Sequence, residues 1–134
     1  MPIDHVKPPV SDVDASRAFY SGALAPFGYV LVYDGESSLG FGRGDGAEDE
    51  EPFAVERAAA PSVPTHVAFT SSSLEQVDAF HAAAVAAGGA DNGPPGVRPD
   101  GGYYYAAFVR DPVGHNVEAV YHGPASWREP APAD

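Results

Sequence analysis

An internal repeat constrains the fold of this chain more than any other feature of its sequence. When the chain is shifted by 61 positions, so that Thr65 falls on Asp4, DHVKPPVSDVDASRAFYSGAL aligns with THVAFTSSSLEQVDAFHAAAV. Each copy predicts a short strand, a polar turn and then a helix. Two copies of one such unit predict two similar halves that bury their apolar faces together.

Each copy carries the signals that begin and end a helix. In the first copy, Asp12 or Asp14 is suited to cap the helix and Gly28 to end it. In the second copy, the three serines at 71–73 supply the cap and Gly88 ends the helix. The apolar stripe expected on the second helix comprises Leu74, Val77, Phe80, Ala84 and Val85.

Short β-like segments follow each helix and are separated by turn residues. They comprise residues 29–33, 39–42 and 53–58 in the first half and 103–109 and 116–121 in the second. Between them, ADNGPPGVRPDGG is dominated by turn residues, so any strand over 90–102 should be short or irregular. The pattern predicts one α+β domain over 1–122, built from two βαβββ modules at about 1–60 and 61–122, with a C-terminal extension at 123–134.

Composition and charge narrow the classes of protein to which the chain can belong. Its 134 residues, 44% hydrophobic and 19% charged, suit one domain with a sizeable core. The absence of cysteine excludes disulfides, thiolate zinc sites and cysteine nucleophiles. A net charge of -12 argues against nucleic acid or an anionic membrane as a partner. The sequence shows neither a secretory signal nor an apolar run of the roughly 20 residues that span a bilayer, so a cytoplasmic protein is expected.

The repeat also pairs ionisable residues. His5 aligns with His66 at the shift of 61, and Glu56 aligns with Glu118 when FAVE is laid over HNVE. Neutral imidazoles and carboxylates are the ligands that zinc, nickel, iron and manganese accept from proteins without cysteine. If the modules pair around a pseudo-twofold axis, the four side chains can converge on one divalent metal ion. The alternative is a pair of structural histidines with glutamates on solvated faces, where Arg57 would pair with Glu56.

Two stretches of the chain match a known pattern. In YYYAAFVRDPVGHNVEAVYH, at 103–122, an Asp-Pro-x-Gly turn is followed by a strand bearing Glu118, and the opening DHVKPPVSDVDASRAFYSGAL joins a strand, a Val-x-Asp turn and a Phe-Tyr helix. With these motifs the chain resembles the vicinal oxygen chelate superfamily, which contains glyoxalase I, the extradiol dioxygenases and the bleomycin- and fosfomycin-resistance proteins. The resemblance implies the glyoxalase/dioxygenase-like fold, a curved mixed sheet around a central cavity.

The resemblance also implies roles for the four paired residues. His5, His66 and Glu118 correspond to the family's metal ligands, and Glu56 to a fourth ligand that in glyoxalase-like members also moves a substrate proton. The bound ion would be divalent: iron, nickel, zinc or manganese. In extradiol dioxygenases, two histidines and one carboxylate hold iron(II), and the sequence fits either pattern.

Three hypotheses about function remain open. The leading one is a metal-dependent enzyme, either a lyase or isomerase or an extradiol-type dioxygenase, acting on a small oxygen-rich substrate that chelates the metal. The second is a metal-free protein that binds an antibiotic or metabolite, since the acidic charge would suit a cationic ligand, and the third is a scaffold. A homodimer is expected, with the modules pairing within one chain or between two.

Residues near the end of the second module are candidates for contact with a substrate: Tyr103, Tyr105 and His122. Tyr104 is expected to face away from its two neighbours because side chains alternate along a strand. His115 lies an odd number of positions from Glu118 and is expected to point away from it. Among the few basic residues, Lys7 and Arg98 are the candidates for holding an anionic group of a substrate.

Overall fold

The structure of the protein is a computed structural model that describes residues 3–44, 52–59, 63–99 and 103–123. Its elements in chain order are β1 (Pro9–Val10), α1 (Val13–Ala23), the 3-10 helix η1 (Ala25–Phe27), β2 (Tyr29–Asp34), β3 (Ser38–Arg43), β4 (Phe53–Arg57), β5 (His66–Thr70), α2 (Leu74–Ala86), β6 (Ala90–Val97), β7 (Tyr105–Arg110) and β8 (Asn116–Tyr121). The expected module boundary at 60–62 and nearly all of the expected C-terminal extension lie outside the described residues. No helix in these ranges is long and apolar enough to cross a membrane.

The two modules fold alike, as the repeat predicts. Strands β1, β4, β3 and β2 form a first four-stranded sheet in that order, and β5, β8, β7 and β6 form a second. In each sheet the first strand of the module runs parallel to the last, and all other neighbours are antiparallel. This confirms the predicted α+β fold of two βαβββ modules, with two sheets that stay separate and do not close on each other.

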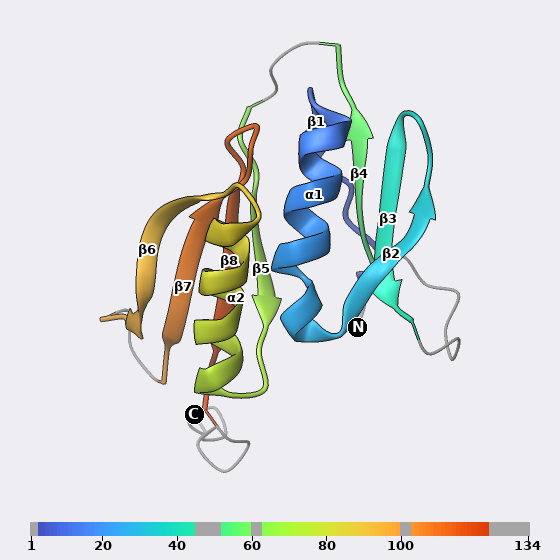
Figure 1. Ribbon diagram of the computed structural model, residues 1–134. Helices are drawn as coiled ribbons and strands as arrows, with labels where there is room; N and C mark the ends of the chain where they lie inside the picture. Colours follow the sequence, from blue (N-terminus) through green and yellow to red (C-terminus); the bar gives the residue numbers. More distant parts are fainter. Residues whose placement is uncertain (1–2, 45–51, 60–62, 100–102, 124–134) are drawn as a thin grey trace, which may run out of the picture.

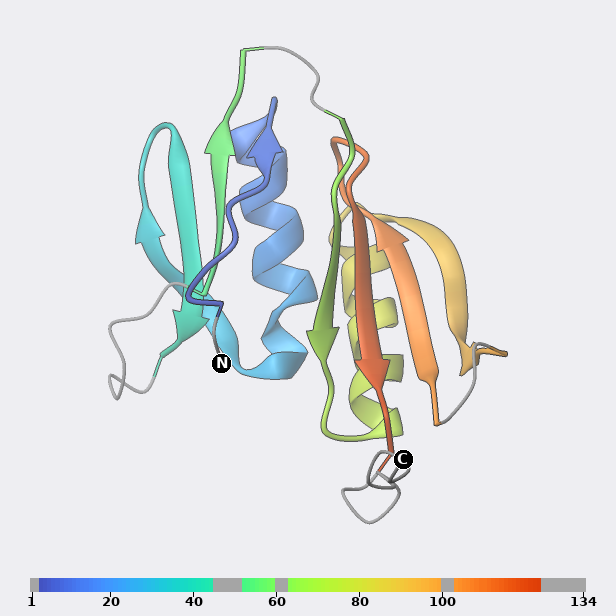
Figure 2. The same cartoon turned by 180° about the vertical axis from the view of Figure 1, so that it is seen from behind.

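Both helices lie on the same side of the sheets and pack against each other (Figure 1). Seen from behind, β1 and β5 are the inner edges of the two sheets and face each other (Figure 2). Strands β4 and β8 point in opposite directions in both views, as expected for modules related by a pseudo-twofold axis. Each sheet therefore has one face covered by a helix and one open face.

The predicted N-terminal caps of both helices are present, whereas the first helix ends at Ala23, before Gly28, which instead ends η1. The carboxylate of Asp12 accepts a hydrogen bond from Ala15 N at 3.0 Å at the start of α1, and the hydroxyl of Ser73 accepts one from Gln76 N at 3.1 Å at the start of α2. Gly88, just after α2, has a φ of 108°, in the left-handed region that favours glycine. The bonds of Asp12 and Ser73 set where each helix begins.

The buried faces of the two helices meet in one core shared by both modules. Phe19 of α1 and Phe80 of α2 are fully buried, and the rings of Phe69 in β5 and Phe53 in β4 meet with their centroids 5.2 Å apart. Burying such a ring stabilises the fold by about 1.5–3 kcal/mol, so the shared core holds the modules in one relative position. The stripe on α2 is narrower than predicted: Val85 is 41% exposed, because the preceding alanine takes the core position.

Strand β6 is longer than the sequence predicts. The segment dominated by turn residues forms an eight-residue strand at the outer edge of the second sheet. Its pairing with β7 shifts register on both sides of Gly93, so the strand is irregular, as expected. An edge strand leaves some N–H groups without a strand partner, which is why it tolerates prolines at 94 and 95. This strand adds a fourth row of side chains to the open face of the second sheet.

Candidate functional site

The open face of the second sheet gathers most of the residues that could carry chemistry. On β8, both neighbours of Glu118 belong to the core, so Glu118 faces the open side. The register pairs Glu118 with Ala68 of β5 and with Phe108 of β7. His66 lies two positions before Ala68 and therefore shares the same face.

Glu118 is a buried carboxylate with two close partners. Its side chain is 2% exposed, its Oε1 lies 2.8 Å from His66 Nε2, and its Oε2 accepts a hydrogen bond from the Tyr104 hydroxyl. A buried carboxylate needs such partners because an unpaired charge is costly to remove from water. The imidazole of His66 is 53% exposed, so the pair is reached from solvent through this ring.

The two donor atoms of this pair are in direct hydrogen-bond contact. Neighbouring donors of a tetrahedral ion at about 2.1 Å are separated by about 3.4 Å, so His66 Nε2 and Glu118 Oε1, which lie 2.8 Å apart, would have to move apart slightly to hold one ion. Within the described ranges, however, no group of three or more His, Asp or Glu side chains is placed for one ion. A single chain therefore brings together two of the ligands predicted from the sequence.

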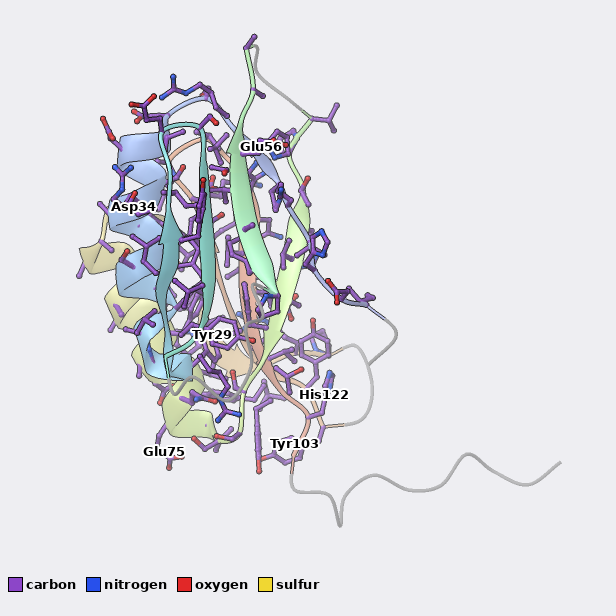
Figure 3. All side chains as sticks on the ribbon, turned by 90° about the vertical axis from the view of Figure 1, so that its right-hand side faces the viewer. Tyr29, Asp34, Glu56, Glu75, Tyr103 and His122 are labelled. Atoms are coloured by element: carbon purple, nitrogen blue, oxygen red, sulfur yellow. The ribbon has the colours of Figure 1, made fainter. Side chains whose placement is uncertain are left out.

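The predicted pair in the first module is arranged differently. His5 is half exposed, with its Nδ1 2.6 Å from the carboxylate of the preceding residue. Glu56 is exposed on β4, far from the end of the molecule where His122 lies (Figure 3). The structure does not bring His5 and Glu56 to each other or to the second-module pair, and their role as ligands stays a prediction.

The sheet register explains this difference. In the second sheet, the residue opposite Glu118 comes two positions after His66. In the first sheet, the parallel bridge before β1 places the residue two positions after His5 opposite Ala54. Ala54, and not Glu56, is therefore the equivalent of Glu118 when the histidines are aligned, and Glu56 lies about 7 Å further along the strand.

Tyr104, and not its neighbours, contacts the buried carboxylate. Tyr105 donates a hydrogen bond to Asp78 of α2 at 2.6 Å and so lies on the helix-covered face. Tyr103 packs against Tyr121, with ring centroids 5.6 Å apart. The three tyrosines alternate as expected, but Tyr104, and not Tyr105, lies on the face of the sheet that carries Glu118. Counting residues outward from the Asp-Pro-x-Gly turn would have placed Tyr104 on the side of the glutamate.

His122 lies at the rim of the same face. Its ring meets the ring of Tyr104 edge-on, with centroids 5.3 Å apart, and its Nδ1 lies 3.1 Å from the carbonyl oxygen of Tyr103. Figure 3 shows His122 and Tyr103 at one end of the molecule. Tyr104 therefore lies between His122 and the buried carboxylate, and the contact of His122 with a substrate stays a prediction.

A cleft of about 860 Å³ lies between the N-terminal segment and β5. Its lining comprises residues 65–70 on one side and 3–4 and 6–9 on the other, with Tyr29, Arg43, Pro52 and Phe53. This volume suits a small-molecule ligand. His66 lines the cleft and also contacts Glu118, so its imidazole borders both the cleft and the open face of the second sheet.

The turn that leads into β8 is fixed by a buried network. Asp111 accepts a hydrogen bond from the Tyr20 hydroxyl of α1 at 2.6 Å, and another from His115 N at 2.8 Å. Burial first, and then the charge of Asp111, raises the pKa of Tyr20 well above its ordinary value. The His115 ring points away from Glu118, as predicted: its Nδ1 accepts a hydrogen bond from Thr65 N, and its Nε2 donates to the carbonyl of Pro9. These bonds tie the turn to the other module and so help to position Glu118.

Comparison with known proteins gives the family. Residues 2–119 match the model of the Glyoxalase/Bleomycin resistance protein/Dioxygenase superfamily, so the chain belongs to this superfamily. The chain is 29% identical to a glyoxalase/bleomycin resistance protein from Albidiferax ferrireducens, whose crystal structure it matches over 90% of its own length and 99% of that chain with a TM-score of 0.78.

Two further solved structures share the fold. A glyoxalase-related enzyme from Fulvimarina pelagi is 21% identical, with coverage of 87% of this chain and 84% of that chain and a TM-score of 0.66. A protein titled lactoylglutathione lyase, from Agrobacterium tumefaciens, is 20% identical, with coverage of 87% and 90% and a TM-score of 0.62. No curated protein matches the chain.

Proposed function

We propose that the protein is a divalent-metal-dependent enzyme of the glyoxalase/dioxygenase type, acting on a small oxygen-rich substrate that chelates the metal. The observation that carries the proposal is the contact between Glu118 and His66, a buried carboxylate and a half-exposed imidazole 2.8 Å apart on an open face. A bound divalent ion would polarise the oxygens of the substrate and stabilise negative charge that develops on them.

The proposed ligand set is His66 and Glu118 with His5 as the third member. Because Ala54 takes the position on β4 equivalent to Glu118, Glu56 is the weakest of the four residues suggested by the repeat. Two histidines and one carboxylate are the set that leaves adjacent coordination positions open in non-haem iron(II) oxygenases. The register therefore favours dioxygenase chemistry over a lyase that would use Glu56 as its base.

A homodimer would supply the third ligand. The open face of the first sheet exposes Val30 and Tyr33, which are 48% and 51% exposed and lie opposite glycines of β3. In the proposed dimer this face of one copy covers the open face of the second sheet of the other, which would bring His5 toward the pair formed by His66 and Glu118. Burial of this apolar surface would stabilise the association.

The residues around the pair have proposed roles of their own. The Tyr104 hydroxyl, bonded to Glu118, would hold this carboxylate in the orientation that a metal needs. His122, against the ring of Tyr104, is placed to contact a substrate at the rim.

The test is a titration of the chelator-stripped protein with iron(II), nickel, zinc and manganese by calorimetry. We expect about one ion per chain for at least one metal, and loss of binding in the double variant His66→Ala/Glu118→Ala. The matched control is Glu75→Ala/His81→Ala, which removes the same residue types from α2 and should bind as the wild type does. No binding by the wild type, or equal binding by the two double variants, would refute the proposal.

A second candidate function, metal-free ligand binding, is favoured by one observation. Both oxygens of Glu118 already have partners, His66 and Tyr104, without an ion. If no metal binds, the cleft of about 860 Å³ beside His66 would be the ligand site. Screening cationic compounds for a rise in melting temperature would then test this function.

A further inference from the structure

The side chain of Arg98 lies on the same open face as the buried carboxylate. Arg98 follows β6, and its backbone N donates a hydrogen bond to the carbonyl of Tyr104 at 2.8 Å. Its guanidinium carbon lies 5.2 Å from the ring centroid of Phe108, the residue that the register places opposite Glu118. The guanidinium therefore turns back along β6 into the row of the sheet that contains Glu118.

Two glycines make room for this guanidinium. A Cβ atom on Gly93 would lie 3.2 Å from Arg98 Nη2, and one on Gly96 would lie 3.4 Å from Arg98 Nη1. Nη2 also donates a hydrogen bond to the carbonyl of Pro94 at 2.7 Å. The group thus lies between its own strand and an aromatic ring, where a cation–π contact and one hydrogen bond hold it.

The charge of Arg98 is not neutralised by a carboxylate in the described part of the chain. Arg17, by contrast, pairs with both Asp14 and Asp34. Arg57 and Arg110 also bond to backbone carbonyls, and no ion pair to a carboxylate is found for them in the described ranges, so Arg98 differs from them by its contact with the ring of Phe108. Within the described residues its guanidinium makes no other hydrogen bond, and a planar guanidinium matches the two oxygens of a carboxylate.

Phe108 separates the guanidinium from the proposed metal ligands. Its ring centroid lies 6.1 Å from that of His66 and 5.2 Å from the guanidinium carbon of Arg98. Phe108 of β7 pairs with Glu118 of β8 on one side and with Gly93 of β6 on the other. These three residues therefore form one row across the second sheet. Two strand spacings amount to about 10 Å, a span that one small molecule can cover.

We propose that Arg98 is a specificity-determining residue that binds an anionic group of the substrate, while the chelating oxygens of the same molecule meet His66 and Glu118. The substrate class is thereby narrowed to small molecules that carry vicinal oxygens at one end and a carboxylate at the other. This inference rests on the proposed function, because it takes the His66–Glu118 pair as the place of chelation.

Two matched probes test the assignment. 3-(3,4-Dihydroxyphenyl)propionate carries a vicinal diol and a distant carboxylate, and 4-propylcatechol has the same shape without the charge. Calorimetric titration into the metal-loaded wild type should show the carboxylate probe binding about tenfold more tightly, the ratio that one charge-assisted hydrogen bond gives. Arg98→Met should abolish this preference and leave the affinity for 4-propylcatechol unchanged, and Arg98→Lys should restore part of it.

The control variant is Arg110→Met, which removes an arginine that lies on the same face and bonds to the carbonyl of Gly114. This variant should keep the full preference for the carboxylate probe. Equal affinities of the two probes for the wild type, including the case in which neither binds, would overturn the assignment, as would a preference that survives Arg98→Met. Failure of the metal proposal has a different signature: the chelator-stripped wild type would then bind no divalent ion in the calorimetric titration, whatever the two probes do.

Discussion

Replacing Tyr20 with phenylalanine removes one hydroxyl from the centre of the molecule and nothing else. The side chain is 1% exposed, and its hydroxyl donates to Asp111 Oδ2 at 2.6 Å. The other oxygen of Asp111 accepts hydrogen bonds from the backbone N–H groups of Val113 and His115. The phenylalanine ring would keep the contacts with neighbouring rings, so the change isolates one hydrogen bond to a buried carboxyl group.

The expected effect follows from that geometry. A hydrogen bond to a charged group contributes about 1.5–3 kcal/mol, and Asp111 would lose the only bond made to its Oδ2 by a side chain of the described residues. We therefore expect Tyr20→Phe to lower the free energy of unfolding by about 2 kcal/mol. In urea, with a slope of about 1.5 kcal/mol per molar for a chain of this size, the midpoint should fall by about 1 M.

The assay is urea unfolding followed by circular dichroism, with Tyr33→Phe as the matched control. Tyr33 is 51% exposed, so its variant should stay within about 0.5 kcal/mol of the wild type. Because burial and Asp111 raise the pKa of Tyr20, its contribution is present below pH 10 and is lost as the pH rises through the folded-state pKa. A Tyr20→Phe variant as stable as the Tyr33→Phe control would refute the reasoning.

Two further predictions concern packing and charge. Gly89→Ala should lower the free energy of unfolding by about 1–3 kcal/mol, because its new Cβ would lie 2.4 Å from Val109 Cγ1 and 2.5 Å from Phe19 Cε1; an unchanged urea midpoint would contradict this. His81→Gln should raise the pKa of Asp91 toward its ordinary value of 3.8, because the hydrogen bond from His81 is the largest cause of its lowering. Titration by NMR measures this pKa directly, and the stability that it reflects is present above pH 3.8 and lost as the pH falls through the folded-state pKa.

The repeat was sufficient to predict the architecture of the chain. It placed both helices between strands, and the caps Asp12 and Ser73 followed from the preference of such side chains for free N–H groups. Strand β6 was harder to predict because glycine and proline favour turns locally, whereas its edge position lets β7 supply pairing on one side only. In β6, pairing with β7 outweighed the local preference of glycine and proline for turns.

The candidate site could be predicted in its second half but not in its first. His66 and Glu118 lie in a regular parallel pairing, so the contact between them followed from the repeat, whereas their role as ligands stays a prediction. In the first module, the prolines at 8 and 9 cannot donate to the sheet, and β1 is only two residues long. The offset between β1 and β4 is therefore set by backbone contacts that a sequence alignment does not reveal, and Glu56 lies beyond the position that the repeat assigned to it.

The most direct test of the proposed metal centre is to locate the ion in a crystal of the metal-loaded protein by anomalous scattering at its absorption edge. The account predicts one strong peak within about 2.1 Å of both His66 Nε2 and Glu118 Oε1, in place of the direct contact between these two atoms. A loaded crystal in which that contact persists and the ion lies elsewhere would contradict the account.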